Sequence, residues 1–407
     1  MIASGNAWIL CATNVYWRTF SRKDGRHGRC GKLMNENFFR KNNAEVAAVY
    51  RGKTVLVTGH TGFKGGWLSL WLTQLGARVI GYALDPPSTP NLFDAIGLQE
   101  KITHILGDVR DYDHLLSIFH LDQPEMVFHL AAQPLVRLSY QDPRGTYETN
   151  IMGTVNVLEA VRHTPSVRVV VNVTSDKCYE NREWVWGYRE QDPMGGRDPY
   201  SSSKGCCELV TAAYLRSFFP PEQYGKTHGM ALASARAGNV IGGGDWGKDR
   251  LVPDCVRALS RKEEIVLRYP QSIRPWQHVL EPLGGYLLLG AGLWQDGLRY
   301  VGSWNFGPSD NDVWTVEEVV REIIRLWGQG SYRVESDGHP HEAHWLKLDW
   351  SKARVHLGWH TWYNIQAALS LSIDWYRLFY AGDSKEELYR RTADQIALYM
   401  AEKDRGV

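Results

Sequence analysis

The sequence is poor in the features that mark several large classes of protein. Its 407 residues carry a net charge of only +1, which gives no overall attraction to nucleic acid or to an anionic membrane. No uninterrupted apolar run reaches the roughly 18 residues of a membrane-spanning helix. The cysteines are few and none forms a Cys-x-x-Cys pair: Cys11, Cys30, Cys178, Cys206, Cys207 and Cys255. We therefore expect a cytoplasmic protein with free thiols that binds neither nucleic acid nor membrane.

The beginning of the chain differs from the rest, whose composition is that of an ordinary globular protein. The first 50 residues hold eight Lys or Arg against three Asp or Glu. Basic residues follow the mildly apolar stretch 7–16, which is the reverse of a secretory signal. We predict that residues 1–50 are an extension that is either disordered or upstream of a true start at Met34.

From residue 53 onward, short apolar runs alternate with helical patterns. The apolar runs are rich in β-branched residues, as buried parallel strands are, and lie at residues 54–58, 78–84, 102–106, 126–130, 168–173 and 230–235. The helical patterns between them cover residues 66–75, 112–119, 150–162 and 201–218. This alternation indicates an α/β fold of the Rossmann type, with a doubly wound parallel sheet covered by helices on both faces.

This regularity fades after Gly238. Helical patterns are then separated by loops, and they lie at residues 279–293, 315–327 and 365–380. The pattern indicates a smaller, mixed α+β C-terminal lobe. The predicted division is an NAD-binding domain over residues 51–238 and 276–300, and a sugar-nucleotide-binding lobe over residues 239–275 and 301–400.

A glycine pattern directly follows the first predicted strand. The segment Gly-His-Thr-Gly-Phe-Lys-Gly starts at Gly59 and ends at Gly65. Gly59 permits a tight turn, Gly62 lets the backbone approach a pyrophosphate, and Gly65 allows close contact between helix and strand. The N-terminus of the following helix offers N–H groups to the phosphates. A glycine-rich turn alone is weak evidence, but the strand before it and the helix after it favour a dinucleotide site that includes Thr61 and Phe63.

Acidic residues after the next two predicted strands bear on the choice of cofactor. Asp85 closes the second strand, where a carboxylate can bond the ribose hydroxyls of NAD and would repel the 2′-phosphate of NADP. A solvated loop carboxylate is the alternative for Asp85. Asp108 and Val109 follow the third strand, where they would border the adenine. The predicted cofactor is therefore NAD.

Two further segments carry candidate catalytic groups. Tyr200 and Lys204 form a Tyr-x-x-x-Lys motif on one face of a predicted helix, where the ammonium is expected to lower the pKa of the phenol. A phenolate is then a usable base. Ser175, Asp176 and Lys177 follow the fifth strand, whose carboxyl end faces the ligand crevice in such sheets. The alternative is a solvated strand end and an exposed Tyr and Lys.

Together these motifs resemble those of the extended short-chain dehydrogenases/reductases, the NAD-dependent epimerase/dehydratase family. The similarity runs in order over residues 52–400, and its motifs are the glycine loop, Leu130, Ala131, Ala132, Ser175, Tyr200 and Lys204. The resemblance implies a Rossmann domain with a sugar-nucleotide lobe. It also implies that Leu130 to Ala132, Tyr200 and Lys204 contact NAD, and that the protein is a homodimer or a higher homo-oligomer.

Within this family, Ser175-Asp176-Lys177 occupies the place of the Thr-Asp-Glu of the dTDP-sugar 4,6-dehydratases. The epimerases of the family lack the Asp–Glu pair of that motif. The segments 59–65, 175–179, 244–254 and 274–279 are more similar still to dehydratases that act on a CDP-hexose. The resemblance implies conversion of CDP-D-glucose to CDP-4-dehydro-6-deoxy-D-glucose and water. That product would feed deoxysugar synthesis for bacterial O-antigen lipopolysaccharide.

The implied mechanism assigns a role to each catalytic residue. Tyr200 would take the proton of the 4-hydroxyl, and Asp176 would protonate the leaving 6-hydroxyl. Lys177 stands where the dTDP-sugar enzymes have Glu, and an ordinary Lys is neutral in only about one molecule in a few thousand at pH 7. Lys177 is predicted to be the base that removes the C5 proton, which requires a lowered pKa. Stabilisation of the C5 enolate by Lys177 is the alternative.

Three residues are candidates for binding the substrate. Asn239 is placed near the substrate by the resemblance. Arg274 is a candidate because a guanidinium suits paired phosphate oxygens, and Arg250 is another. A surface salt bridge is the alternative for each arginine. Lys64, His60 and His278 could equally be structural.

Other functions stay open on the sequence alone. They are another sugar-nucleotide 4,6-dehydratase or a 4-epimerase, a non-catalytic NAD-binding regulator on the same fold, and a nucleic-acid-binding protein that uses the basic extension. Tyr200 and Lys204 argue against the regulator. No metal site is predicted, because His339, His341 and His344 lack the spacing of helical ligands.

Overall fold

The structure is a computed structural model that describes residues 43–309, 314–335 and 346–405. Several residues named above lie outside this range: Cys11, Cys30, Met34, His339, His341 and His344.

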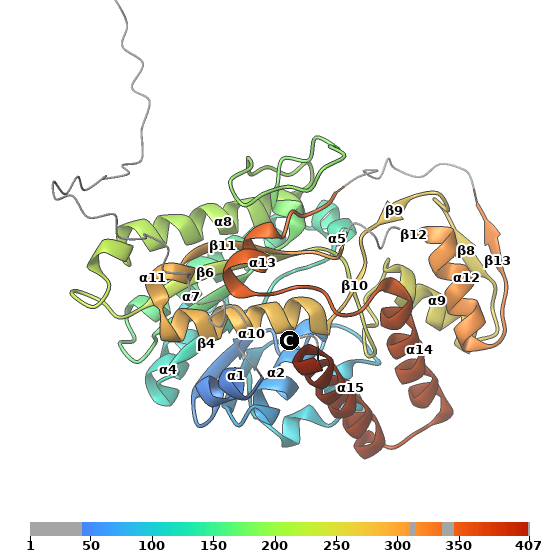
Figure 1. Ribbon diagram of the computed structural model, residues 1–407, viewed down its shortest axis with the longest axis horizontal. Coiled ribbons are helices and arrows are strands. Elements are labelled where there is room, and N and C mark those ends of the chain that lie inside the picture. Colours follow the sequence, from blue (N-terminus) through green and yellow to red (C-terminus); the bar gives the residue numbers. More distant parts are fainter. Residues whose placement is uncertain (1–42, 310–313, 336–345, 406–407) are drawn as a thin grey trace, which may run out of the picture. The chain divides into compact units, whose positions relative to one another are not determined.

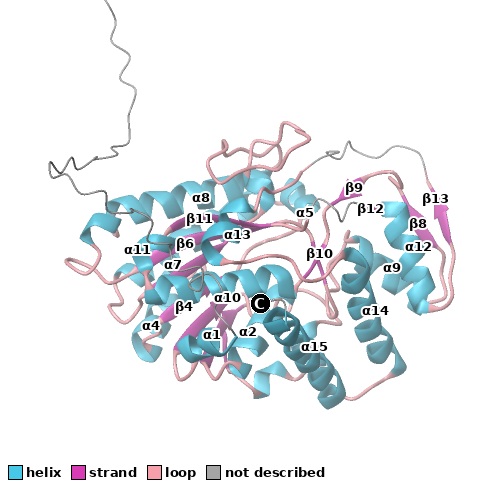
Figure 2. Ribbon diagram, in the orientation of Figure 1, coloured by secondary structure: helices cyan, strands magenta, loops and turns pink. Residues whose placement is uncertain are grey.

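Seven parallel strands form the main sheet in the order β11-β6-β5-β4-β1-β2-β3 (Figures 1 and 2). Their bounds are Thr54–Thr58 (β1), Arg78–Ala83 (β2), Thr103–Leu106 (β3), Met126–His129 (β4), Val169–Val173 (β5), Ala231–Ala237 (β6) and Gly302–Phe306 (β11). Val55 of β1 lies opposite Val79 of β2 and Met126 of β4. The strand order reverses at β1 and β4, so the predicted doubly wound sheet is confirmed, and its carboxyl edge has a switch point there.

Helices cover both faces of this sheet because successive strand residues point to opposite sides. Leu56 packs in one apolar cluster with Val127, and Val55 and Val57 pack in the other. The first cluster takes side chains from α4, α7 and α8, and the second from α1, α2 and α10. Their bounds are Asn43–Tyr50 (α1), Phe63–Gln74 (α2), Tyr112–Asp122 (α4), Gly153–Arg162 (α7), Pro199–Ser217 (α8) and Leu280–Gln295 (α10).

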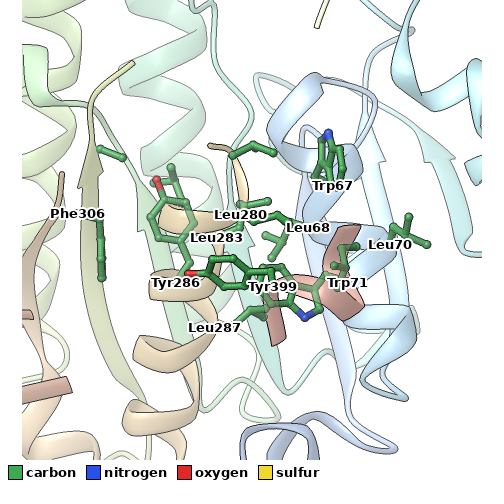
Figure 3. Close-up of a cluster of buried hydrophobic side chains, with 14 of the residues drawn as sticks. Trp67, Leu68, Leu70, Trp71, Leu280, Leu283, Tyr286, Leu287, Phe306 and Tyr399 are labelled. Carbon is green, nitrogen blue, oxygen red and sulfur yellow. The ribbon is translucent and has the colours of Figure 1, made fainter. Parts of the chain in front are cut away.

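Large side chains from α2, α10 and the C-terminal helix α15 (Lys385–Arg405) meet in the second cluster, as Figure 3 shows. Trp71 of α2 lies edge-on to Tyr399 of α15, with 5.6 Å between ring centroids. Tyr286 of α10 lies edge-on to Phe306 of β11 at 5.6 Å. Removing apolar surface from water stabilises the folded chain by about 25 cal/mol per Å². This packing therefore holds α15 firmly against the helix that follows the glycine loop.

Downstream of β6 the chain forms a smaller region of helices and two-stranded sheets, at the right of Figure 1. Its helices are Leu251–Ser260 (α9), Val316–Trp327 (α12) and Ile365–Ala381 (α14), whereas the short helix Ser351–Leu357 (α13) packs beside β11 and α10. Its paired strands are Val240–Ile241 (β7) with Gln277–His278 (β10), Ile273–Arg274 (β9) with Trp314–Thr315 (β12), and Ile265–Leu267 (β8) with Tyr332–Val334 (β13). The predicted mixed α+β character of this part is confirmed.

Short helical segments connect these elements. They are Leu92–Ala95 (α3), Val136–Gln141 (α5), Pro143–Tyr147 (α6) and Gly297–Tyr300 (α11), with tighter or wider turns at Leu98–Glu100 (η2), Glu148–Met152 (η3), Asp176–Cys178 (η4) and Pro221–Gln223 (η5).

Two segments depart from the predicted division of the chain. Residues 43–50, the end of the predicted extension 1–50, form α1, in which Tyr50 is buried and donates a hydrogen bond to the carbonyl of Leu287 at 2.7 Å. Residues 302–306, assigned to the lobe, form β11 and join the main sheet beside β6. Helix α1 is too short for a clear helical pattern, and β11 alternates polar with apolar residues instead of forming an apolar run. The remaining domain boundaries stay predictions.

Candidate active site

The glycine loop between β1 and α2 is a backbone cradle too tight for side chains. Gly59 has a φ of +77°, a conformation that favours glycine, and a Cβ there would lie 2.7 Å from the backbone nitrogen of Ala131. A Cβ at Gly65 would lie 2.1 Å from the carbonyl oxygen of Gly59. The loop therefore has the close backbone approach that a pyrophosphate-binding turn needs.

Helix α2 begins at this loop. Gly62 is its N-cap, Phe63 is its first residue, and no side chain among the described residues caps it. The hydroxyl of Thr61 donates a hydrogen bond to the carbonyl of Leu84 at 2.9 Å, which ties the loop to the end of β2. N–H groups in a first helical turn have no partner within the helix, and the helix dipole favours an anion there. Loop and helix end together fit the diphosphate of a dinucleotide.

The segment after β4 is bonded to the end of β1. The Thr58 hydroxyl oxygen accepts hydrogen bonds from the backbone N–H groups of Leu130 and Ala131, both at 3.1 Å. It also lies 2.7 Å from Nδ1 of His129. Burial lowers the pKa of His129 to about 3, so this imidazole is neutral. Leu130, Ala131 and Ala132 thus run beside the glycine loop.

The acidic candidates for NAD binding lie at the ends of β2 and β3. Asp85 is exposed. Asp108 is bound by Arg110, whose Nη2 lies 2.6 Å from its Oδ2. Burial opposes ionisation of Asp108, but hydrogen bonds from Arg110 outweigh it and lower the pKa of the carboxyl. Val109 is buried. The Arg110 contact commits much of the Asp108 carboxylate, which the sequence did not indicate.

Ser175, Asp176 and Lys177 lie together in the turn after β5. The Ser175 hydroxyl donates a hydrogen bond to Oδ1 of Asp176 at 2.9 Å and accepts one from the backbone N–H of Lys177 at 3.2 Å. Asp176 is 6% exposed. Burial raises the pKa of Asp176, although the Lys177 charge and the bond from Ser175 lower it in part. A raised pKa suits a carboxyl group that has to carry a proton.

Tyr200 and Lys204 lie one turn apart near the start of α8. Pro199 opens the helix, and the carboxylate of Asp198 caps it by accepting a hydrogen bond from the backbone N–H of Ser201 at 2.9 Å. This start places Tyr200 and Lys204 on one buried face, 8% and 6% exposed. The structure therefore brings all five predicted catalytic residues into two neighbouring segments.

The electrostatics of Tyr200 differ from the expectation. Burial raises the pKa of the phenol to about 12, and a hydrogen bond with Ser175 and the charge of Arg250 lower it in part. Burial also lowers the pKa of Lys204. We expected the ammonium of Lys204 to lower the pKa of the phenol. Arg250, fifty residues away in sequence, is the cation that lowers it most.

Arg250 is held in place by a buried carboxylate. It directly precedes α9, and its Nη1 donates hydrogen bonds to both oxygens of Asp245, at 2.9 and 2.8 Å. Its charge also acts on Lys64. Arg250 is therefore part of the same charged cluster as Tyr200 rather than only a surface ion pair.

The two other substrate candidates lie in different places. Asn239 follows Gly238 just after β6, and its carbonyl accepts a hydrogen bond from the backbone N–H of Gln277 at 3.1 Å. A Cβ at Gly238 would lie 3.1 Å from Oδ2 of Asp176, so this segment borders the catalytic carboxyl. Arg274 lies on β9 of the smaller region.

Lys64, whose role the sequence left open, belongs to the same charged cluster as Tyr200 and Arg250. It is the second residue of α2. Burial, together with the charges of Arg250 and Lys204, lowers its pKa to about 8, while Asp176 raises it. A lysine at a helix N-terminus faces the positive end of the helix dipole. That unfavourable placement was the only signal available in the sequence.

Two histidines left open by the sequence are buried and neutral. Burial lowers the pKa of both His60 and His278 to about 3. Nε2 of His60 lies 2.7 Å from Nδ1 of His104, and His278 lies edge-on to Trp67. Among the described residues, no group of three or more His, Cys, Asp or Glu side chains could hold a metal ion.

No helix within residues 43–309, 314–335 and 346–405 is long and apolar enough to cross a membrane. The cysteines in these ranges are all free thiols: Cys178, Cys206, Cys207 and Cys255.

A doubly wound sheet with a glycine cradle at its switch point and a Ser-Asp, Tyr-Lys constellation beside it defines a class of nucleotide-sugar enzymes. The chain belongs to the GDP-mannose 4,6 dehydratase family, whose model matches residues 56–371, within the extended short-chain dehydrogenases/reductases. The resemblance seen in the sequence is therefore confirmed at the level of the family.

Individual relatives narrow the comparison. The chain is 52% identical to CDP-glucose 4,6-dehydratase of Salmonella typhimurium over 353 residues, which cover 86% of this chain and 97% of the relative. It is 27% identical over 350 residues to dTDP-glucose 4,6-dehydratase of Xanthomonas campestris, with 79% and 93% covered.

Solved structures share the fold. That of dTDP-glucose 4,6-dehydratase from Bacillus anthracis, in complex with NAD, aligns with a TM-score of 0.66 and 22% identity over 80% of this chain and 97% of the other. UDP-glucose 4-epimerase from Thermotoga maritima, with UDP-glucose, aligns with a TM-score of 0.66 and 23% identity over 80% and 99%.

Proposed function

We propose that this chain is an NAD-dependent 4,6-dehydratase that converts CDP-D-glucose to CDP-4-dehydro-6-deoxy-D-glucose and water. The 52% identity to a CDP-glucose 4,6-dehydratase, over nearly the full length of that relative, supports the substrate. The observation that carries the chemistry is the convergence of Asp176 and Tyr200 at one edge of the sheet, beside a glycine cradle.

The residues of the cofactor side fit NAD. Gly59, Thr61, Gly62, Phe63 and Gly65 would hold the pyrophosphate, because a Cβ would fill the cradle and the helix end favours an anion. The exposed carboxylate at the end of β2, Asp85, would bond the adenosine ribose. The cofactor would also contact residues at the same carboxyl edge of the sheet: Asp108, Val109, Leu130, Ala131 and Ala132. NAD, when bound, supplies the acceptor and donor of a hydride.

Oxidation at C4 is the first step. Tyr200, as the phenolate, takes the proton of the 4-hydroxyl while the C4 hydride leaves the sugar. Burial alone would keep the phenol protonated, since it raises the pKa to about 12. The hydrogen bond with Ser175 and the charge of Arg250 oppose burial and therefore help to form the base. Lys204 is buried one turn further along α8, where it would contact the cofactor and hold it in a fixed orientation.

Elimination of water follows, because the new 4-ketone acidifies the C5 proton. Lys177, as the neutral amine, removes this proton and becomes the ammonium, and the protonated carboxyl of Asp176 gives its proton to the leaving 6-hydroxyl as the C6–O bond breaks. The raised pKa of Asp176 supports its role as the acid. Return of the hydride to C6 and of a proton to C5 completes the product and regenerates the cofactor.

Asn239, Arg250 and Arg274 are the proposed contacts of the sugar nucleotide. Asn239 borders Asp176 through Gly238, which supports a contact with the hexose. A guanidinium suits the paired oxygens of the diphosphate, and Arg274 on β9 can provide one.

We infer that the protein works as a homodimer in the cytoplasm and feeds deoxysugar synthesis for a bacterial surface polysaccharide. Large apolar side chains are exposed on α8 and on two segments that contact it, α5 and η3: Leu138 (40%), Tyr140 (66%), Met152 (49%) and Leu209 (61%). Such a patch is typical of an interface between copies. Sedimentation of the purified chain as a monomer would contradict the dimer.

One incubation tests the proposed function. The purified chain is mixed with NAD and, separately, with CDP-, dTDP-, UDP- and GDP-linked hexoses, and the products are weighed by mass spectrometry. Loss of one water from CDP-glucose is expected. A product of unchanged mass with inverted C4 would indicate a 4-epimerase, and no product from any substrate would indicate a non-catalytic NAD-binding protein.

A further inference from the structure

A fully buried ion pair lies directly behind the catalytic turn. Glu208 is on α8, one turn beyond Lys204, and pairs with Arg236 of β6 at 2.6 Å. Both side chains are 3% exposed. Burial raises the pKa of Glu208, but Arg236 outweighs this effect, so the pKa falls below its usual value and the carboxylate stays charged.

Glu208 is bonded to the front end of the catalytic turn. One carboxylate oxygen accepts a hydrogen bond from the hydroxyl of Thr174, the residue before Ser175. The other oxygen accepts hydrogen bonds from Arg236 and from the hydroxyl of Ser234, the latter at 2.7 Å. Glu208 thus joins α8 to both β5 and β6.

Arg236 is bonded to the far end of the same turn. Its Nη1 donates a hydrogen bond to the phenol oxygen of Tyr179 at 2.6 Å, and its guanidinium lies 5.0 Å from the centre of that ring. The Tyr179 hydroxyl in turn donates to Oδ1 of Asn305 on β11 at 2.8 Å. Tyr179 directly follows the short helix Asp176–Cys178. The ion pair is therefore hydrogen-bonded to both ends of the segment that carries Asp176 and Lys177.

The same ion pair is connected to Tyr200 and Lys204 through helix α8. Tyr200, Lys204 and Glu208 are spaced four residues apart and share one face of α8. Any shift of the turn relative to α8 must therefore break bonds to a buried carboxylate, which is costly. A well-packed apolar pair could be equally stable, so stability alone does not explain why charges are buried here.

We propose that the pair Glu208–Arg236 is a positioning device that holds Asp176 and Lys177 in register with Tyr200 for the elimination step. The inference rests on the proposed dehydratase function. The oxidation step uses Tyr200 and Lys204, which α8 itself positions, and it depends on the turn only through the hydroxyl of Ser175. Elimination also needs the acid and the base of the turn, so loosening the turn should slow elimination more than oxidation.

The test uses variants that cut the two links and leave the buried charges in place. Thr174→Val removes the link to the front of the turn, and Tyr179→Phe removes the link to its far end. Ser234→Ala is the matched control, because it removes a hydrogen bond to the same carboxylate from a residue outside the turn. Because the two links are cut independently, failure of one variant to fold leaves the other to decide.

Single-turnover reactions with CDP-glucose separate the steps, since bound NADH reports oxidation and the 4-keto-6-deoxy product reports elimination. In each link variant we expect elimination to slow by about tenfold to a hundredfold, as for a misplacement of about 1 Å, with NADH accumulating. Ser234→Ala should stay within about twofold. Equal slowing of both steps, or equal effects in all three variants, would overturn the positioning role. A wild type that makes no product would instead defeat the proposed function.

Discussion

The two sides of the carboxyl edge are built by different means. On the cofactor side, at the ends of β1 and β4, the backbone forms the site: Gly59 and Gly65 leave no space for a Cβ, and Thr58 bonds main-chain N–H groups. On the catalytic side, at the end of β5 and on α8, buried polar side chains form it, among them Asp176 and Lys204. The cofactor side is therefore defined by the shape of the backbone, and the catalytic side by the charges of buried side chains.

This difference teaches which substitutions each side tolerates. On the cofactor side any added atom displaces backbone, so the size of a side chain matters more than its polarity. On the catalytic side burial shifts the pKa of Asp176, Tyr200 and Lys204, so a change that preserves size but removes an ionisable atom is damaging. Four predictions test the contrast, from the largest expected effect to the smallest.

Removing one hydroxyl from the catalytic side should have the largest effect. Tyr200→Phe keeps the size of the ring and removes the base, so kcat is expected to fall by about 10²- to 10⁴-fold. Initial rates of 4-keto product formation measure this. Tyr214→Phe on the same helix, whose hydroxyl bonds Glu159 instead, is the control and should be nearly unaffected. A mild loss in Tyr200→Phe would show that another group takes the proton.

Two lysines near Asp176 should differ in their effects. Lys177→Met is expected to leave C4 oxidation intact and to reduce exchange of the C5 proton with deuterated solvent by about 10²-fold or more, because the base is lost. Lys64→Met removes a neighbouring charge only and should reduce exchange less. Mass spectrometry of the recovered hexose measures the exchange. Undiminished exchange in Lys177→Met, with loss in Lys64→Met, would transfer the role of base to Lys64.

A single methyl group should disable the cofactor side. Gly65→Ala places a Cβ 2.1 Å from the carbonyl oxygen of Gly59, so the loop must shift. Overpacking of this kind costs about 1–3 kcal/mol, or about 5- to 150-fold in NAD affinity if the whole cost falls on binding. Gly229→Ala is the matched control, because a Cβ there meets no described atom within 4 Å. Calorimetric titration with NAD checks both, and equal affinities would contradict a tight cradle.

Acid should destabilise the fold through buried histidines such as His278, which packs against Trp67 of α2. The pKa of His278 is about 3 in the folded chain against an ordinary 6.5. Above pH 6.5 the folded and unfolded states are both neutral at this position, and below it the unfolded state binds the proton more readily. Stability is therefore lost as the pH falls from 6.5 towards 3. His278→Phe should reduce the loss between pH 7.5 and 5.5 by about 1 kcal/mol, measured by urea unfolding. An identical loss in both proteins would contradict this.

The same contrast explains what the sequence could predict. The glycine loop, the strands and the Tyr-x-x-x-Lys motif depend on neighbours within a few residues, so local pattern identified them. The bond between Glu208 and Arg236 spans 28 positions, and that from Arg236 to Tyr179 spans 57. Such contacts exist only after β5, β6 and α8 are assembled. Helix α1 and strand β11 were missed for the related reason that their order comes from packing on the sheet.

Lys64 shows most directly what a sequence pattern cannot predict. The sequence left the role of this lysine open, whereas its pKa of about 8 depends on burial and on the charges of Asp176, Arg250 and Lys204, which lie on three other segments. No pattern in a linear sequence contains that environment.

The central claim is that one hydride moves from C4 to C6 of the same sugar, and isotope tracing tests it most directly. CDP-glucose carrying deuterium at C4 is converted by the wild-type chain with unlabelled NAD, and the product is analysed by NMR. The account predicts a 4-keto-6-deoxy product with the deuterium at C6. Deuterium that stays at C4, or that is lost to solvent, would contradict it.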